Sequence, residues 1–152
     1  MTNLKIKKRL SYALLMALTM LWPSCKSETE LTQQELVTAQ LVADGDSWEA
    51  GSVTIDEVDE SGLFDHFSIK FTEQEFTTEN GGVVWPSSGT WSFTSPEAAS
   101  FKRGDGIEVL IESIGKDELG LSHEWDQTTL DVEGGKVVSR KGRHRFKFRR
   151  RK

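Results

Sequence analysis

Near its C-terminal end the chain reads Gly142-Arg143-His144-Arg145-Phe146-Lys147-Phe148-Arg149. Aromatic side chains alternate here with basic ones, which is the period of a β-strand with one buried face and one solvated face. A strand of this kind is stable only within a larger sheet that covers its apolar face. The stretch therefore predicts an antiparallel sheet and requires partner strands elsewhere in the chain.

The same alternation recurs from residue 46 onward. It predicts inward-facing side chains at Val53 and Ile55; Phe67, Ile69 and Phe71; Trp91 and Phe93; Ile107, Val109 and Ile111; and Leu119, Leu121, His123 and Trp125. Glycine-rich turn signals separate these runs, among them Asn80-Gly81-Gly82, Gly104-Asp105-Gly106 and Gly134-Gly135. About eight strands over about 46–150 predict an all-β fold, either an antiparallel barrel or a sandwich.

A short helix is predicted ahead of the strands, over about 32–44. Thr32 followed by Glu35 is a capping-box pattern, and Gly45 provides a stop signal. The helix carries a narrow apolar stripe formed by Leu36, Ala39 and Val42 or Leu41. The stripe predicts that the helix packs against one end of the sheet.

The first 25 residues have the composition of an export signal. A basic region over Lys5 to Arg9 precedes an apolar run over Leu10 to Trp22. The run is shorter than the roughly 20 apolar residues that span a bilayer, which favours a cleaved signal peptide. It is followed by Cys25, the only cysteine in the chain.

This segment resembles a bacterial lipoprotein signal, in which a cysteine is lipidated and becomes the mature N-terminus. Pro23 departs from that pattern, because this position is usually small or aliphatic. The resemblance implies a signal peptide over 1–24, lipid attachment at Cys25, a tether over 25–31 and one β domain over 32–152. A cysteine that carries two or more acyl chains is a stable membrane anchor. The polar segment Lys26 to Glu30 is similar to the tether of Bacteroidetes lipoproteins and implies an outer-membrane location, displayed at the cell surface.

The formal net charge of -5 conceals a division of charge along the chain. All 24 acidic residues lie between Glu28 and Glu133, whereas ten basic residues and no acidic ones lie between Lys136 and Lys152. On an alternating strand these basic side chains form the outer face, where acidic side chains of neighbouring strands are their expected partners. The pattern favours pairing within the domain over binding to nucleic acid.

The middle of the chain carries a longer resemblance. The stretch from Asn80 to Thr94, with Phe101 to Ile107 and the strand Gly142 to Phe148, resembles small lipocalin-like lipoproteins of the Bacteroidetes. The similarity covers roughly 36–148. It implies a lipocalin-like barrel with a ligand-holding cup, although the usual glycine-X-tryptophan of the first strand reads Asp46-Ser47-Trp48 here.

Four tryptophans and one histidine are the candidates for a ligand site: Trp48, Trp85, Trp91, His123 and Trp125. Inward side chains of a small barrel either fill it or wall a pocket for one small ligand. The first interpretation is therefore a non-catalytic lipoprotein that binds a small apolar or amphiphilic molecule. The alternative is a structural or protein-interaction lipoprotein with a filled core.

Neither His144 nor the remaining motif predicts another kind of site. His144 is expected to face inward beside Phe146, but no metal-ligand spacing is present, and neither a metal, a cofactor nor a catalytic residue is expected. The tripeptide Arg103-Gly104-Asp105 matches an adhesion motif, yet its glycine and aspartate suit a turn before the next strand.

Overall fold

The computed structural model describes residues 30–131 and 135–152 of the chain. The predicted signal peptide over 1–24, the lipid-attachment residue Cys25 and most of the tether lie outside the described residues. Within the part that is described, no helix is both long and apolar enough to cross a membrane.

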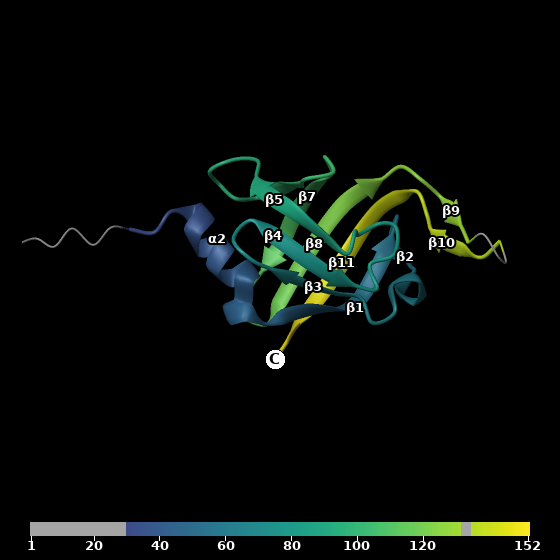
Figure 1. Ribbon diagram of the computed structural model, residues 1–152, viewed down its shortest axis with the longest axis horizontal. Coiled ribbons are helices and arrows are strands. Elements are labelled where there is room, and N and C mark those ends of the chain that lie inside the picture. Colours follow the sequence, from purple (N-terminus) through teal and green to yellow (C-terminus); the bar gives the residue numbers. More distant parts are fainter. Residues whose placement is uncertain (1–29, 132–134) are drawn as a thin grey trace, which may run out of the picture. The chain divides into compact units, whose positions relative to one another are not determined.

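Eight antiparallel strands in the described residues form a closed barrel (Figure 1). In the order in which they pair they are β1 (Ser47–Ile55), β3 (Ser68–Phe71), β4 (Glu75–Glu79), β5 (Ser88–Phe93), β6 (Ser100–Arg103), β7 (Glu108–Ile114), β8 (Glu118–Trp125) and β11 (Gly142–Arg151). Strand β11 pairs with β8 on one side and with β1 on the other, from Ser47↔Arg151 to Ile55↔His144. The predicted all-β, lipocalin-like architecture is confirmed, and of the two alternatives the chain forms the barrel.

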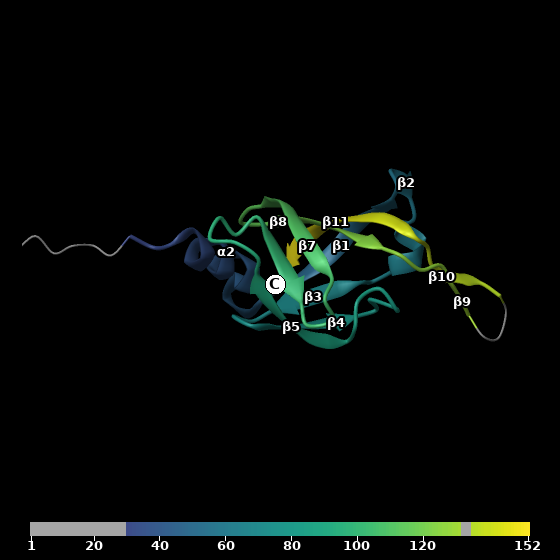
Figure 2. The ribbon, with the colours of Figure 1, turned by 90° about the horizontal axis from the view of Figure 1, so that it is seen from above.

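The two ends of the barrel differ. At one end lie α2 (Gln33–Val42) and the 3-10 turn η1 (Ala43–Gly45), and at the other lies a hairpin of β9 (Thr129–Leu130) and β10 (Val137–Ser139) (Figures 1 and 2). Strand β2 (Val58–Asp59) and the 3-10 turn η2 (Ser61–Phe64) follow β1 near the hairpin. We refer to these as the helix end and the hairpin end.

The predicted capping box of the helix is present. The amide of Glu35 donates to Thr32 Oγ1 at 3.2 Å, and the amide of Thr32 donates to Glu35 Oε2 at 2.7 Å. The predicted apolar stripe is wrong in part, because Leu36 is 45% exposed and the buried side chains are Val37 and Leu41. These two residues lie one helical turn apart, and their side chains close the helix end of the barrel.

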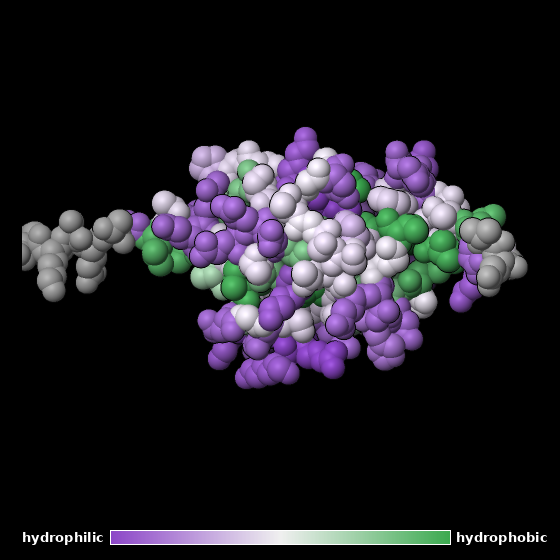
Figure 3. Space-filling model, in the orientation of Figure 1, coloured by the Kyte–Doolittle hydropathy of each residue, from purple (hydrophilic) through white to green (hydrophobic). Residues whose placement is uncertain are grey.

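Aromatic side chains fill the barrel. Seven phenylalanines and three tryptophans are buried to 4% exposure or less: Phe64, Phe67, Phe71, Phe76, Phe101, Phe146, Phe148, Trp48, Trp85 and Trp91. Their ring centroids lie 5.1 to 6.5 Å apart in mostly tilted or edge-to-face pairs, the geometry that aromatic quadrupoles prefer. The outer surface in Figure 3 is largely polar, with apolar side chains gathered toward the hairpin end of this face.

Candidate functional site

Trp85 lies inside the barrel although it belongs to the β4–β5 loop over 80–87. Its side chain is 1% exposed, and its ring contacts those of Phe67, Phe76, His123 and Phe146 at centroid distances of 6.0, 5.7, 5.6 and 6.0 Å. The loop thus inserts an indole into the hairpin end of the core. The local sequence does not predict this position, because apolar and polar residues do not alternate on either side of Trp85.

Two loop glycines make the insertion possible. A Cβ atom on Gly81 would lie 2.6 Å from the Cβ of Trp85 and 2.7 Å from its carbonyl oxygen. Gly82 has a φ of +61°, a backbone conformation that residues other than glycine rarely adopt. The Trp85 amide donates to the Gly81 carbonyl at 3.1 Å. The turn is therefore tight enough to exclude a side chain at Gly81.

Arg103 holds the inserted loop. Its Nη1 donates to the carbonyl of Val84 at 3.0 Å, and its guanidinium carbon lies 4.6 Å from the centre of the Trp85 ring. Asp105 accepts from Nε at 3.1 Å and forms a short ion pair with Nη2. Partial burial raises the pKa of the Asp105 carboxyl, but the hydrogen bonds and charge of Arg103 outweigh burial and lower the pKa.

These contacts show what the Arg103-Gly104-Asp105 tripeptide does in the fold. The Arg103 side chain is 1% exposed and points into the barrel, while Gly104 and Asp105 begin the β6–β7 turn. The expectation of a turn is thus met, and the arginine is not presented to a partner. Sequence reasoning missed the inward role of Arg103. The signal for it is the two-residue spacing from the buried Phe101, which places both side chains on one face of β6.

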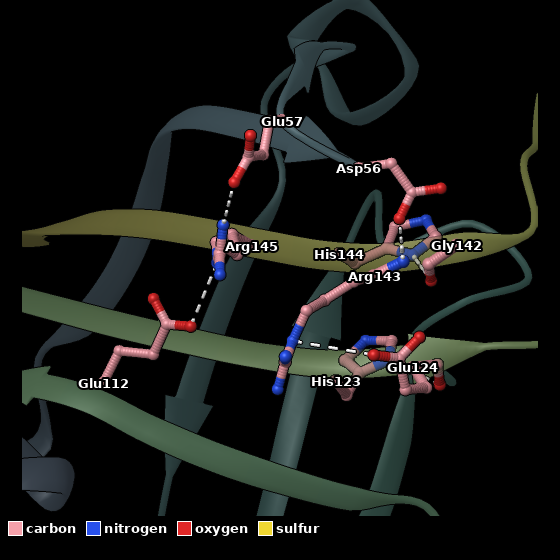
Figure 4. A network of polar contacts seen from close by, with 9 residues as sticks. All are labelled: Asp56, Glu57, Glu112, His123, Glu124, Gly142, Arg143, His144 and Arg145. Carbon is pink, nitrogen blue, oxygen red and sulfur yellow. Dashed lines mark hydrogen bonds and ion pairs between the residues drawn. The ribbon is translucent and has the colours of Figure 1, made fainter.

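Two histidines stand opposite each other on neighbouring strands. His123 on β8 pairs with His144 on β11, and their rings are parallel within 7° at a centroid distance of 5.5 Å. Each Nδ1 lies within hydrogen-bond distance of a backbone carbonyl, that of Glu124 at 3.2 Å for His123 and that of Gly142 at 3.1 Å for His144 (Figure 4). Carbonyls only accept, so each Nδ1 carries the hydrogen and each Nε2 is an acceptor.

Burial keeps both imidazoles neutral. His123 is 2% exposed and His144 is 0% exposed. Burial, with a smaller contribution from the charge of Arg103, lowers the pKa of His123 to about 4, although the hydrogen bond to the Glu124 carbonyl acts in the opposite direction. Burial also lowers the pKa of His144. The pair therefore presents two uncharged acceptor nitrogens at neutral pH.

Three buried polar atoms at this end of the barrel have no hydrogen-bond partner among the described residues: Trp85 Nε1, His123 Nε2 and His144 Nε2. We call the three residues the indole–imidazole cluster. Ser122 Oγ, Arg143 Nε and Arg150 Nε also lack a hydrogen bond, but Arg143 Nε lies 3.6 Å from Glu124 in an ion pair and the Arg150 guanidinium lies over the Trp48 ring. A buried polar group left unpaired costs roughly 1–3 kcal/mol, so a cluster of three calls for an explanation.

The sheet is open beside the cluster. The β7–β8 ladder begins at Leu110↔Ser122, and its continuation would place Glu108 opposite Glu124. Like charges directly opposite each other are destabilising, which accounts for the end of the pairing there. A hollow of about 300 Å³ lies at this opening, lined by Ile107, Glu108, Leu110, His123, Glu124 and Arg143.

The remaining candidate residues lie elsewhere. Trp48 is at the helix end, where its Nε1 donates to the Leu41 carbonyl at 2.8 Å. Trp91 donates to the carbonyls of Thr72 and Glu75 at 3.1 and 3.2 Å. Trp125 sits at the hairpin rim, with its Nε1 3.3 Å from Ser139 Oγ. Of the five predicted residues, the structure thus brings Trp85 and His123 together.

Two basic side chains on the outer face of β11 pair with acidic side chains, as the sequence predicts. Arg145 lies 3.2 Å from Glu112 and 3.4 Å from Glu57, and Arg143 lies 3.6 Å from Glu124 (Figure 4). These exposed pairs contribute little individually, typically 0–1 kcal/mol. They show that Arg143 and Arg145 of β11 are paired with acidic side chains of the same domain.

Comparison with family models, with curated proteins and with solved structures finds no match to this chain. Among the described residues no group of three or more histidine, cysteine, aspartate and glutamate side chains is placed to hold a metal ion. The indole–imidazole cluster is therefore the candidate site on its own geometry.

Proposed function

We propose that this chain is a membrane-anchored, lipocalin-like lipoprotein that binds a small amphiphilic ligand without catalysis. The indole–imidazole cluster at the hairpin end is the proposed site. The observation that carries the proposal is the group of three buried, unpartnered polar atoms on Trp85, His123 and His144. A ligand that pairs with them would recover the hydrogen bonds that the fold leaves unmade.

The surroundings of the cluster suit an amphiphile. The rings of Phe64 and Phe146 lie 5.8 and 6.1 Å from that of His144, so apolar walls flank the polar atoms. Ligand sites of this kind combine an apolar lining with a few polar groups that fix orientation. The opening between β7 and β8 offers a route from the surface to His123.

We propose that the chain is not catalytic because of the groups that the two imidazoles contact. Within the described residues both Nδ1 atoms contact backbone carbonyls rather than carboxylates. A general base held by a carboxylate, as in hydrolytic triads, has no counterpart in this arrangement. The pair is thus suited to binding rather than to proton transfer.

The membrane anchor is proposed from the sequence. An apolar run that ends in Cys25, followed by a polar tether, is typical of an exported lipoprotein. The first described helix, α2, begins at Gln33, eight residues after Cys25 in the sequence. An outer-membrane location with surface display is the corresponding proposal for its place in the cell.

A second candidate function is a structural or protein-interaction lipoprotein with a filled core. The observation that favours it is the dense ring packing, in which Phe146 alone contacts Phe64, Phe67, Trp85, His123, His144 and Phe148. In this case buried water would satisfy the cluster. A small-molecule measurement separates the two candidates.

The test uses the full chain carrying Cys25→Ala, a substitution that removes the proposed acylation site. This protein is exposed to an envelope lipid extract and then analysed by native mass spectrometry. A retained small molecule and a change in tryptophan fluorescence on titration are expected. Trp85→Phe should weaken retention, whereas Trp91→Phe, which removes a satisfied indole N–H, should not. A protein that retains nothing and whose fluorescence does not respond would favour the filled-core candidate.

A further inference from the structure

We infer that the indole–imidazole cluster selects a neutral hydroxyl-bearing head group, and discriminates against both carboxylates and amines. This inference rests on the proposed ligand-binding function and names the chemical class of the ligand.

The cluster presents one donor and two acceptors. An indole Nε1 can only donate a hydrogen bond. Because the Nδ1 atoms of His123 and His144 face the carbonyls of Glu124 and Gly142, their Nε2 atoms can only accept. A complementary head group must therefore accept from Trp85 and donate to at least one imidazole.

A hydroxyl group meets both requirements with a single oxygen, since it donates one hydrogen and accepts through its lone pairs. A head with two hydroxyls, or a hydroxyl and a neutral N–H, would engage all three atoms. The two imidazoles lie parallel at 5.5 Å on adjacent strands, so a head group that engages both acceptors needs two neighbouring donors.

A carboxylate is disfavoured by the same set of one donor and two acceptors. Its oxygens only accept, so it would pair with the Trp85 N–H but would face the lone pairs of both histidines. Arg103 lies close by with a positive charge, but that charge is already matched by Asp105 through two contacts. Burying an anion beside a satisfied ion pair and two unprotonated acceptors costs more than burying a hydroxyl.

An ammonium group is disfavoured for different reasons. It could donate to both histidines, but it has no acceptor for the Trp85 N–H. The guanidinium of Arg103 stands 4.6 Å from the Trp85 ring, on the aromatic group that would otherwise attract a cation. An ammonium group would therefore leave the buried Trp85 N–H without an acceptor, and Arg103 already lies over the ring that would attract it.

The opening between β7 and β8 provides room for the apolar part of the ligand. Ile107 and Leu110 line it, and Leu110 is 37% exposed. A second hollow of about 430 Å³ shares Ile107 and Glu124 with the first and reaches Trp125. An alkyl or ring tail would lie against these side chains while the head occupies the cluster.

The inference is tested with probes that share one tail and differ in the head: 1-hexanol, hexanoate and hexylamine. Each is titrated at neutral pH into the full chain carrying Cys25→Ala, and binding is followed by tryptophan fluorescence and by ligand-observed NMR. We expect 1-hexanol to bind at least tenfold more tightly than the other two. Trp85→Phe should reduce the affinity for 1-hexanol about tenfold, and Trp91→Phe should leave it unchanged.

The outcomes are distinguishable. Equal binding of all three probes, or tightest binding of hexanoate or hexylamine, would overturn the head-group inference while leaving the proposed function standing. Binding of 1-hexanol that Trp85→Phe does not weaken would overturn it as well, since the ligand would lie elsewhere. No binding of any probe or of the lipid extract would overturn the proposed function and the inference together.

Discussion

The guanidinium of Arg103 lies 4.6 Å from the centre of the Trp85 ring, and its Nη1 donates a 3.0 Å hydrogen bond to the Val84 carbonyl. One buried cation therefore joins strand β6 to the loop that enters the barrel. Its charge is balanced by Asp105, which lies at the rim and is 41% exposed. The position of Trp85, and with it the candidate site, depends on this arginine.

We predict that Arg103→Lys destabilises the protein by about 2–3 kcal/mol, because lysine lacks the planar fork that contacts Asp105, Val84 and Trp85 together. The free energy of unfolding in urea provides the measurement. Lys102→Ala on the same strand, where the side chain is exposed, is the matched control and should change stability by less than about 0.5 kcal/mol. Similar losses in both variants would show that the arginine contacts carry no special weight.

Gly81→Ala should displace the inserted loop. The added Cβ would lie 2.6 Å from the Cβ of Trp85 and 2.7 Å from its carbonyl oxygen, so backbone atoms would have to move. Overpacking of this kind costs roughly 1–3 kcal/mol. A lower urea midpoint and a red-shifted tryptophan emission are expected, because Trp85 would become solvated.

Gly62→Ala is the control for this change, because nothing lies within 4 Å of the Cβ that it would add. Its stability should stay close to that of the unsubstituted chain. If Gly81→Ala leaves both the midpoint and the emission where Gly62→Ala leaves them, the turn at Gly81 is looser than the structure indicates.

The buried and solvated faces of the strands were predictable from the two-residue period of the sequence alone. In β8 and β11 the alternation of His144, Phe146 and Phe148 with basic residues, and of Leu121 and His123 with polar ones, assigns each side chain to its face, and the structure agrees. Closure into a barrel was not fixed by that pattern. A period of two predicts which face is buried, but it does not say whether the first and last strands meet.

The candidate site was predictable only in part. Trp85 and His123 were both expected near a ligand, but only the folded chain brings them to 5.6 Å. The loop carrying Trp85 has no period, so its inward turn depends on Gly81 and on a contact with Arg103 from another strand. Arg103 lies next to a turn, and a charged residue there is ordinarily exposed. Contacts between residues far apart in the sequence decide such positions, and the local sequence pattern does not predict these contacts.

Acidification should destabilise the protein through His123. Burial lowers the pKa of the folded imidazole to about 4, whereas the unfolded side chain titrates near its ordinary value of 6.5. Between these values the unfolded state binds more protons, so stability is retained above pH 6.5 and falls as the pH drops toward 4. At 1.36 kcal/mol per pKa unit the loss from this residue is about 3 kcal/mol.

Urea unfolding of the unsubstituted chain and of His123→Gln, each at pH 7 and at pH 4.5, measures this term. Carboxylates titrate in the same window, so the difference between the two chains isolates the imidazole. The variant should be less sensitive to acid even if it is less stable at neutral pH. Identical acid sensitivity in the two chains would mean that His123 is solvated in the folded state.

The proposed anchor makes a prediction about the chain in cells. If Cys25 carries the lipid, metabolic labelling with palmitate should mark the protein, and Cys25→Ala should abolish the label because no other cysteine is present. Pro23→Leu serves as a companion variant, since leucine restores the usual lipoprotein pattern two residues before the cysteine. Labelling in this variant should equal or exceed that of the natural sequence, and equal labelling of Cys25→Ala would overturn the anchor.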